Sequence, residues 1–223
     1  MSRDEAPRST PDRTPILPEG MPSLEQLALQ PNQSRTDIYM LAVERAAVAR
    51  RLIGEAWSEE ADSTITVDRI ATARAVLGDV CKACNNTGLT SDRNIWRFVS
   101  DTFLMLGDAH TFSYGLSATD DEKRNHFDAM NRCYGVALAA ARRGGGPPQA
   151  EACRRATLAM MSVSKRWTAD GCYETYTTAI LPWTWLWDRK HLPQTREIGA
   201  KIDRVRDLSA EGAQAALRAI YKS

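Results

Sequence analysis

Apolar residues recur at spacings of three and four along most of the chain, and this helical period is the strongest constraint on its fold. In residues 34–57 the period gathers four side chains on one face of a helix: Ile38, Leu41, Val48 and Leu52. Ser34 or Thr36 provides the N-cap. The pattern therefore predicts a helix that buries one face and exposes the other.

Further segments have the same period, and the residues at their ends predict where each helix stops. These segments are residues 66–84, 91–107, 119–143, 149–167, 172–181, 195–208 and 209–221. Gly88 suits a C-terminal cap of the second helix, and Gly107 is expected to end the third. Thr119 and Glu122 have the spacing of a capping box, and Gly144–Pro148 is expected to break the chain between two helices.

The β-branched and aromatic content of residues 172–181 could make a strand, but Pro182 breaks any central strand, so a helix ending near Leu181 is favoured. No alternation of strand and helix patterns appears elsewhere in the sequence. The predicted class is an all-α helical bundle of about six to eight helices. Residues 34–223 are expected to form a single all-helical domain, with a possible sub-boundary at residues 144–148.

The first 33 residues have a different composition from the rest. They contain six of the ten prolines, with charged and small polar residues between them. Such a segment buries too little apolar surface to offset the entropy of ordering it. Residues 1–33 are therefore predicted to be a disordered, Pro-rich N-terminal arm, in which "PSLEQLAL", residues 22–29, could dock as one or two helical turns.

Charge and hydropathy exclude some classes of protein. The 223 residues carry a formal net charge of +1, so no global basic field attracts nucleic acid, and any such contact must come from a local patch. No apolar run approaches the roughly 20 residues that span a bilayer, and no signal peptide begins the chain. The five cysteines indicate reduced thiols, and we expect a cytoplasmic protein without membrane contact.

Cys81 and Cys84 form the one Cys-x-x-Cys pair, and three interpretations of it stay open. The thiols could pack on an apolar helix face, bind zinc with ligands from elsewhere, or act as a redox pair. A zinc site usually needs a second such pair, which this sequence does not contain. A redox pair usually lies beside a βαβ pattern, which is absent too. The first interpretation is favoured, so no metal and no cofactor is expected.

The sequence contains no motif of a nucleophile, a phosphate-binding loop or a zinc protease, so we predict no catalytic residues and no enzyme. Basic doublets are more informative: Arg50–Arg51, Arg142–Arg143, Arg154–Arg155 and Lys165–Arg166. They could line a solvated helix face or hold RNA phosphates. Trp183, Trp185 and Trp187 form the densest aromatic cluster, which could close the core or bind a partner protein.

Four short segments resemble the coat (capsid) proteins of flexible filamentous RNA viruses, the potexvirus and carlavirus type. "LIGEAW", residues 52–57, is similar to an early-helix pattern of that family. "GDVCKACNNTG" matches another family stretch through Asp79, Lys82, Cys84 and Gly88. "WRFVSDTFLML" resembles the helix opened by Arg-x-Phe, and "KRNHFDAM" the segment with a Phe-Asp pair. The resemblance covers residues 50–130, and Ala129 and Met130 replace a second Phe of the family.

This resemblance implies a function and a set of site residues. It implies a helical core behind a disordered arm, Arg97 as the arginine that faces RNA, and Phe127 and Asp128 as the Phe-Asp pair of the RNA-pocket region. The expected function is a structural nucleoprotein of the virion that oligomerises on single-stranded RNA without reading its sequence. The predicted RNA-binding residues are Arg97, Asp128, Arg50, Arg51, Arg142 and Arg143.

A second function of a different class fits the same residues. The chain could be a small intracellular bacterial or phage adaptor or regulator that binds a protein partner through Trp183, Trp185 and Trp187. The coat-like protein would be found in the virion or the host cytoplasm, and the adaptor in the cytoplasm.

Overall fold

Seven helices and no strand make up the residues that the structure, a computed structural model, describes: 17–57, 63–86, 93–144, 147–163 and 208–222. The all-α class is therefore confirmed. The helices are α1 (Leu24–Ala28), α2 (Arg35–Ala56), α3 (Ser63–Asn86), α4 (Arg93–Leu116), α5 (Asp120–Gly144), α6 (Pro147–Val163) and α10 (Ala210–Ala219). Some predicted features lie outside these residues: the cap Gly88, the helices at 172–181 and 195–208, and the Trp-rich segment.

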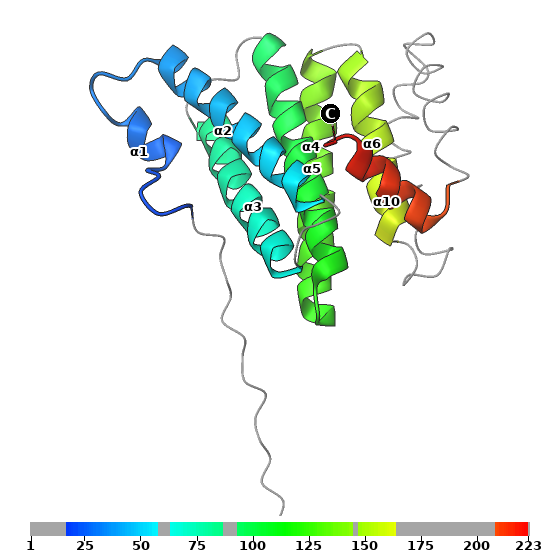
Figure 1. Ribbon diagram of the computed structural model, residues 1–223. Helices are drawn as coiled ribbons and strands as arrows, with labels where there is room; N and C mark the ends of the chain where they lie inside the picture. Colours follow the sequence, from blue (N-terminus) through cyan, green and yellow to red (C-terminus); the bar gives the residue numbers. More distant parts are fainter. Residues whose placement is uncertain (1–16, 58–62, 87–92, 145–146, 164–207, 223) are drawn as a thin grey trace, which may run out of the picture.

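Helix α4 lies at the centre of the bundle. Nearly every side chain from Val99 to Tyr114 is buried, which is typical of a helix surrounded by others. Helices α2, α3, α4 and α5 lie side by side with their axes roughly aligned, α6 lies beyond α4 and α5, and α10 crosses α6 (Figure 1). The faces that α2 and α6 bury are rich in alanine, which lets neighbouring backbones approach closely: Ala42, Ala46, Ala49, Ala152, Ala156 and Ala159.

Side chains at the helix ends satisfy backbone groups as the sequence predicted. Ser34 is the N-cap of α2, and Asp37 completes a capping box with it. Before α5, the Glu122 amide donates to Thr119 Oγ1 at 3.2 Å, and the Thr119 amide donates to Glu122 Oε2 at 3.2 Å. The break between helices is confirmed too, since α5 ends at Gly144 and α6 begins at Pro147.

One predicted helix end is wrong. Helix α4 continues through Gly107 to Leu116 instead of stopping at this glycine. A Cβ atom at Gly107 would lie 2.9 Å from two ring atoms of Tyr134 on α5. The glycine therefore serves close packing between α4 and α5, and its conformational freedom is not used.

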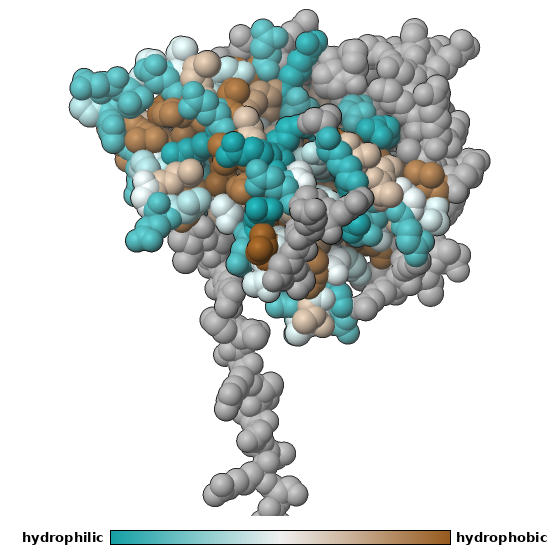
Figure 2. Space-filling model, viewed as in Figure 1, coloured by the Kyte–Doolittle hydropathy of each residue, from teal (hydrophilic) through white to brown (hydrophobic). Residues whose placement is uncertain are grey.

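The predicted boundary of the N-terminal arm at residue 33 is also corrected, because residues 17–33 belong to the folded body. "PSLEQLAL" docks as one helical turn, α1, whose first residue, Leu24, is completely buried. Hydrophobic side chains gather where α1 lies beside α2 (Figure 2). The segment is ordered because it buries apolar side chains, which the proline-rich composition of the segment did not indicate. Residues 1–16 lie outside the described part of the chain.

A buried ion pair holds this segment in place. Arg45 on α2 contacts the carboxylate of Asp79 on α3, and both side chains are buried. The Leu24 amide, at the start of α1, donates to both Asp79 oxygens at 3.1 and 3.2 Å. Arg45 Nη2 also donates to the Pro22 carbonyl at 2.7 Å. The pair thus satisfies backbone groups on both sides of the α1 N-terminus, where a negative charge is favourable.

None of the helices described is long and apolar enough to cross a membrane.

The close approach at Gly107 predicts a large difference between two glycine substitutions. Gly107→Ala should lower the free energy of unfolding by about 1–3 kcal/mol, because the new methyl group overlaps the Tyr134 ring. Gly135→Ala on α5 is the matched control. No atom of the described residues lies within 4 Å of the added Cβ there, so the higher helix propensity of alanine should stabilise the protein by about 0.5–1 kcal/mol. Urea unfolding measures both, and equal effects would contradict the packing role of Gly107.

Candidate functional site

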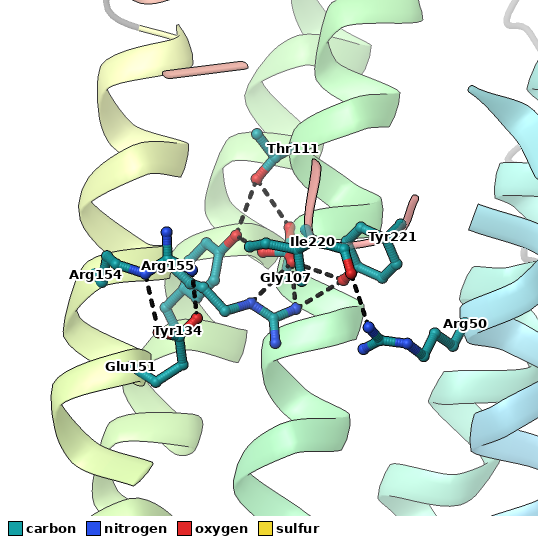
Figure 3. Close-up of polar contacts among 10 residues, drawn as sticks. Arg50, Gly107, Thr111, Tyr134, Glu151, Arg154, Arg155, Ile220 and Tyr221 are labelled. Atoms are coloured by element: carbon teal, nitrogen blue, oxygen red, sulfur yellow. Dashed lines mark hydrogen bonds and ion pairs between the residues drawn. The ribbon is translucent and has the colours of Figure 1, made fainter. Parts of the chain in front are cut away.

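The Asp108 carboxylate is the centre of a buried polar cluster, whose partners Tyr134, Arg155 and Tyr221 are labelled in Figure 3. It lies on α4 with no exposed surface and accepts hydrogen bonds from Tyr134 on α5, Arg155 on α6 and Tyr221 after α10. Arg155 Nε donates at 3.1 Å, the Tyr221 hydroxyl at 2.6 Å, and Arg155 Nη2 forms an ion pair with the same carboxylate oxygen. One side chain therefore joins three separate parts of the chain to α4.

The segment after α10 is held by a second set of contacts. Arg155 Nη2 donates to the Tyr221 hydroxyl at 2.7 Å, and Arg50 Nη2 on α2 donates to the Ile220 carbonyl at 2.7 Å. The Arg50 guanidinium also lies 5.5 Å from the centre of the Tyr221 ring. A Cβ atom at Gly54 would come within 2.6 Å of the Tyr221 carbonyl oxygen, so α2 accepts this segment only because glycine is there.

The charges in this cluster are compensated. Burial raises the pKa of Tyr134 and of Tyr221 well above the ordinary value, so both hydroxyls stay protonated and can donate. Burial lowers the pKa of Arg155, but the adjacent Asp108 raises it more, and the net pKa lies above the usual range. Asp108 has no exposed surface, and its hydrogen bonds and ion pair replace the water that it loses on burial.

The six predicted RNA-binding residues are not gathered in one place. Arg97 on α4 and Arg143 on α5 are both exposed and lie at the same end of the α4–α5 pair. The Arg143 guanidinium lies 4.5 Å from the centre of the half-buried Trp96 ring, which precedes Arg97. The side chain of Arg142 is outside the described set. At this end of α4–α5, cations and an aromatic ring therefore occur together.

The other predicted residues lie elsewhere. Arg50 holds the Ile220 carbonyl, and Arg51 is exposed with a loose ion pair to Glu55 at 3.6 Å. Asp128 is exposed on α5, 15 residues before Arg143, which corresponds to about 22 Å along the helix. The structure does not bring Arg97 and Asp128 together. The predicted partner-binding residues Trp183, Trp185 and Trp187 lie outside the part that the structure describes.

Cys81 and Cys84 lie on the buried face of α3, near Cys133 of α5, and all three are free thiols. Burial raises the pKa of all three: that of Cys84 to about 11, that of Cys133 to about 12, and that of Cys81 well above its ordinary value, with a further contribution from the two neighbouring cysteines. Within the described ranges no three His, Cys, Asp or Glu residues are placed to hold a metal ion. The favoured interpretation, thiols packed on an apolar helix face, agrees with this burial.

A cluster of three basic side chains was missed by the sequence analysis. His110 Nδ1 on α4 lies 3.1 Å from His126 Nδ1 on α5, and Arg74 Nη1 on α3 lies 3.4 Å from the same His126 atom. Burial, together with the nearby positive charge of Arg74, lowers the pKa of His110 to about 3 and that of His126 to about 4. The histidines are scattered in the sequence, so the helix register alone brings them together.

Comparisons with protein-family models, curated proteins and solved structures found no match to this chain.

The Asp108 cluster predicts a severe effect of a small change. Asp108→Asn keeps the shape of the side chain but leaves Arg155 buried without a counter-ion, which should lower the free energy of unfolding by about 3–5 kcal/mol. Tyr134→Phe removes the hydroxyl that donates to Asp108 and lies 3.3 Å from Thr111 Oγ1, and should lower it by a smaller amount, about 1.5–3 kcal/mol. Urea unfolding followed by circular dichroism measures both variants, with the exposed Asp128→Asn as control. A loss at Asp108 no larger than at Asp128 would show that the cluster does not stabilise the bundle.

The two histidines predict how stability depends on pH. Their folded pKa values of about 3 and 4 lie below the unfolded value of 6.5, so the unfolded state binds protons first as the pH falls. Stability should be complete above about pH 6.5 and decrease as the pH falls towards 4 and 3. The slope should be roughly 1–2 kcal/mol per pH unit, reduced because His126 is partly exposed.

Urea unfolding at pH 7.5, 5.5 and 4.5 checks this dependence. A His110→Gln, His126→Gln variant should lose less stability over the same interval than the wild type. An identical loss in both proteins would assign the acid sensitivity to other groups.

Proposed function

We propose that the chain is a coat-like structural protein that self-associates on single-stranded RNA and contacts the backbone without reading sequence. The observation that carries this proposal is the combination of Trp96, Arg97 and Arg143 at one end of the α4–α5 pair. Proteins that bind single strands combine cations for the phosphates with flat side chains on which bases stack. The Arg143 guanidinium, supported by the Trp96 ring, provides such a flat surface, and the exposed Arg97 provides a cation beside it.

Net charge supports a distributed mode of binding. With a net charge of +1, a single subunit attracts RNA weakly, and the affinity depends on few local contacts. Self-association along one RNA strand adds these contacts together, because each bound subunit raises the effective concentration of RNA at the next. A coat-like assembly is therefore the setting in which so small a basic surface would be sufficient.

Arg50, Arg51 and Asp128 have a smaller part in this proposal than the sequence predicted. Arg50 is already engaged with the Ile220 carbonyl, so its removal would disturb the packing of the chain after α10. Arg51 and Asp128 are exposed but lie apart from the Trp96 region. We therefore assign the main RNA contacts to Arg97 and Arg143, together with Arg142, which precedes Arg143 in the sequence.

Binding of a fluorescein-labelled oligouridylate, measured by anisotropy at low salt, tests the proposal. Arg97→Ala and Arg143→Ala should each weaken binding several-fold and reduce the slope of log affinity against log salt by about 0.7 per lost phosphate contact. Arg124→Ala, an exposed arginine on the far half of α5, is the matched control and should bind like the wild type. Helicity should be unchanged in all three.

Microscopy tests the assembly. The purified protein should form filaments or rings, with a 260/280 nm absorbance ratio that stays high after nuclease treatment. A monomer without nucleic acid, together with equal oligouridylate affinity in all variants, would refute the proposal. It would favour the alternative function, an adaptor that binds a protein partner. The next experiment would then test whether Trp185→Ala loses that partner.

A further inference from the structure

The cluster of Arg74, His110 and His126 brings three basic side chains into contact, and among the described residues no acidic side chain forms an ion pair with them. Each comes from a different helix: Arg74 from α3, His110 from α4 and His126 from α5. Arg74 Nε is buried and has no hydrogen-bond partner among the described residues. The three side chains as a whole are partly exposed, so this cluster lies at the surface of the bundle and not in its core.

Chemistry fixes where the protons lie. A guanidinium can only donate, so the contact of Arg74 Nη1 with His126 Nδ1 requires the histidine nitrogen to accept. The shorter contact, 3.1 Å from His110 Nδ1, then requires His110 to carry the proton and donate to the same atom. One lone pair on His126 thus receives two donors. Among the described residues Arg74 makes only the longer of these contacts, at 3.4 Å, and its Nε has no acceptor there.

Within the part of the chain that the structure describes, no acidic group compensates Arg74, and burial lowers its pKa. The charged groups that act on the two histidines are Arg74 from α3 and, from α5, Arg132 and Glu122. Glu122 is held by the amides of Ala118 and Thr119 at the start of α5. The cluster is therefore a small basic surface with an incomplete set of acceptors.

We infer that Arg74, His110 and His126 form a binding site for a phosphate group. A tetrahedral oxyanion would accept from the guanidinium, which presents several N–H groups in one plane, and would provide the negative charge that the cluster lacks. It would draw Arg74 outward and so relieve the buried, unpartnered Nε. It would also favour protonation of the imidazoles, which then become additional donors. This inference stands independently of the proposed function, because the site is distinct from Trp96, Arg97 and Arg143.

Binding and protonation are linked at this site. A phosphate group that stabilises charged imidazoles raises their titration midpoints, and equally binds more tightly as the pH falls. The linkage provides a signature that a general effect of salt does not reproduce. Two sources of the phosphate group are possible, a free phosphate or phosphomonoester and the RNA backbone.

Thermal unfolding with inorganic phosphate tests the site. The melting temperature of the wild type at pH 6 should rise with phosphate concentration relative to sodium chloride of equal ionic strength. Arg74→Gln should abolish this rise, and Arg124→Gln, on the outer surface of α5, should retain it. The same rise in Arg74→Gln as in the wild type would overturn the inference.

Imidazole nitrogen spectra of the wild-type protein give a second test that needs no variant. With phosphate present, the titration midpoints of His110 and His126 should move to higher pH, whereas unchanged midpoints would overturn the inference. Oligouridylate binding then identifies the source of the phosphate group. Weaker binding by Arg74→Gln would assign the site to the RNA backbone, and unchanged RNA binding with a lost phosphate response would assign it to a free phosphate or phosphomonoester.

Discussion

The charge of Asp108 must be balanced inside the bundle, and much of the architecture follows from how it is balanced. A buried carboxylate is tolerated only when hydrogen bonds and an opposite charge replace water. Here the donors come from α5, α6 and the residues after α10, so satisfying one side chain fixes the positions of three elements around α4. Asp79 does the same on the other side, where Arg45 and the Leu24 amide bind α1 to α2 and α3.

Local features of this fold could be predicted from the sequence because they depend on residues three or four positions apart. The helical period located the segments, while the N-cap candidates Ser34 and Thr36 and the capping box of Thr119 and Glu122 indicated two helix starts. The Gly144–Pro148 break follows from backbone chemistry alone. The alanine-rich faces were harder to recognise, since alanine gives a weak apolar signal although it permits the closest helix packing.

Features that depend on the register between helices could not be predicted. A glycine such as Gly107 is typical of a helix end in a sequence. Only the Tyr134 ring beside it shows that it is a packing position. Arg154 and Arg155 looked like one basic doublet, yet neighbours on a helix point about 100° apart. Arg154 pairs with Glu151 near the surface, whereas Arg155 enters the core. The His110–His126 contact likewise arises from the alignment of α4 with α5, which no local pattern in either segment encodes.

The partners of Asp108 also set an order of events during protein synthesis. Arg155 is 47 residues and Tyr221 is 113 residues further along the chain. At about 5–20 residues per second, the ribosome adds Arg155 roughly 2–9 s, and Tyr221 roughly 6–23 s, after Asp108. Until Arg155 is added, Tyr134 is the one of these three partners that the chain already contains. Water hydrates the carboxylate in the meantime, so the final packing of α4 waits until translation has passed α10.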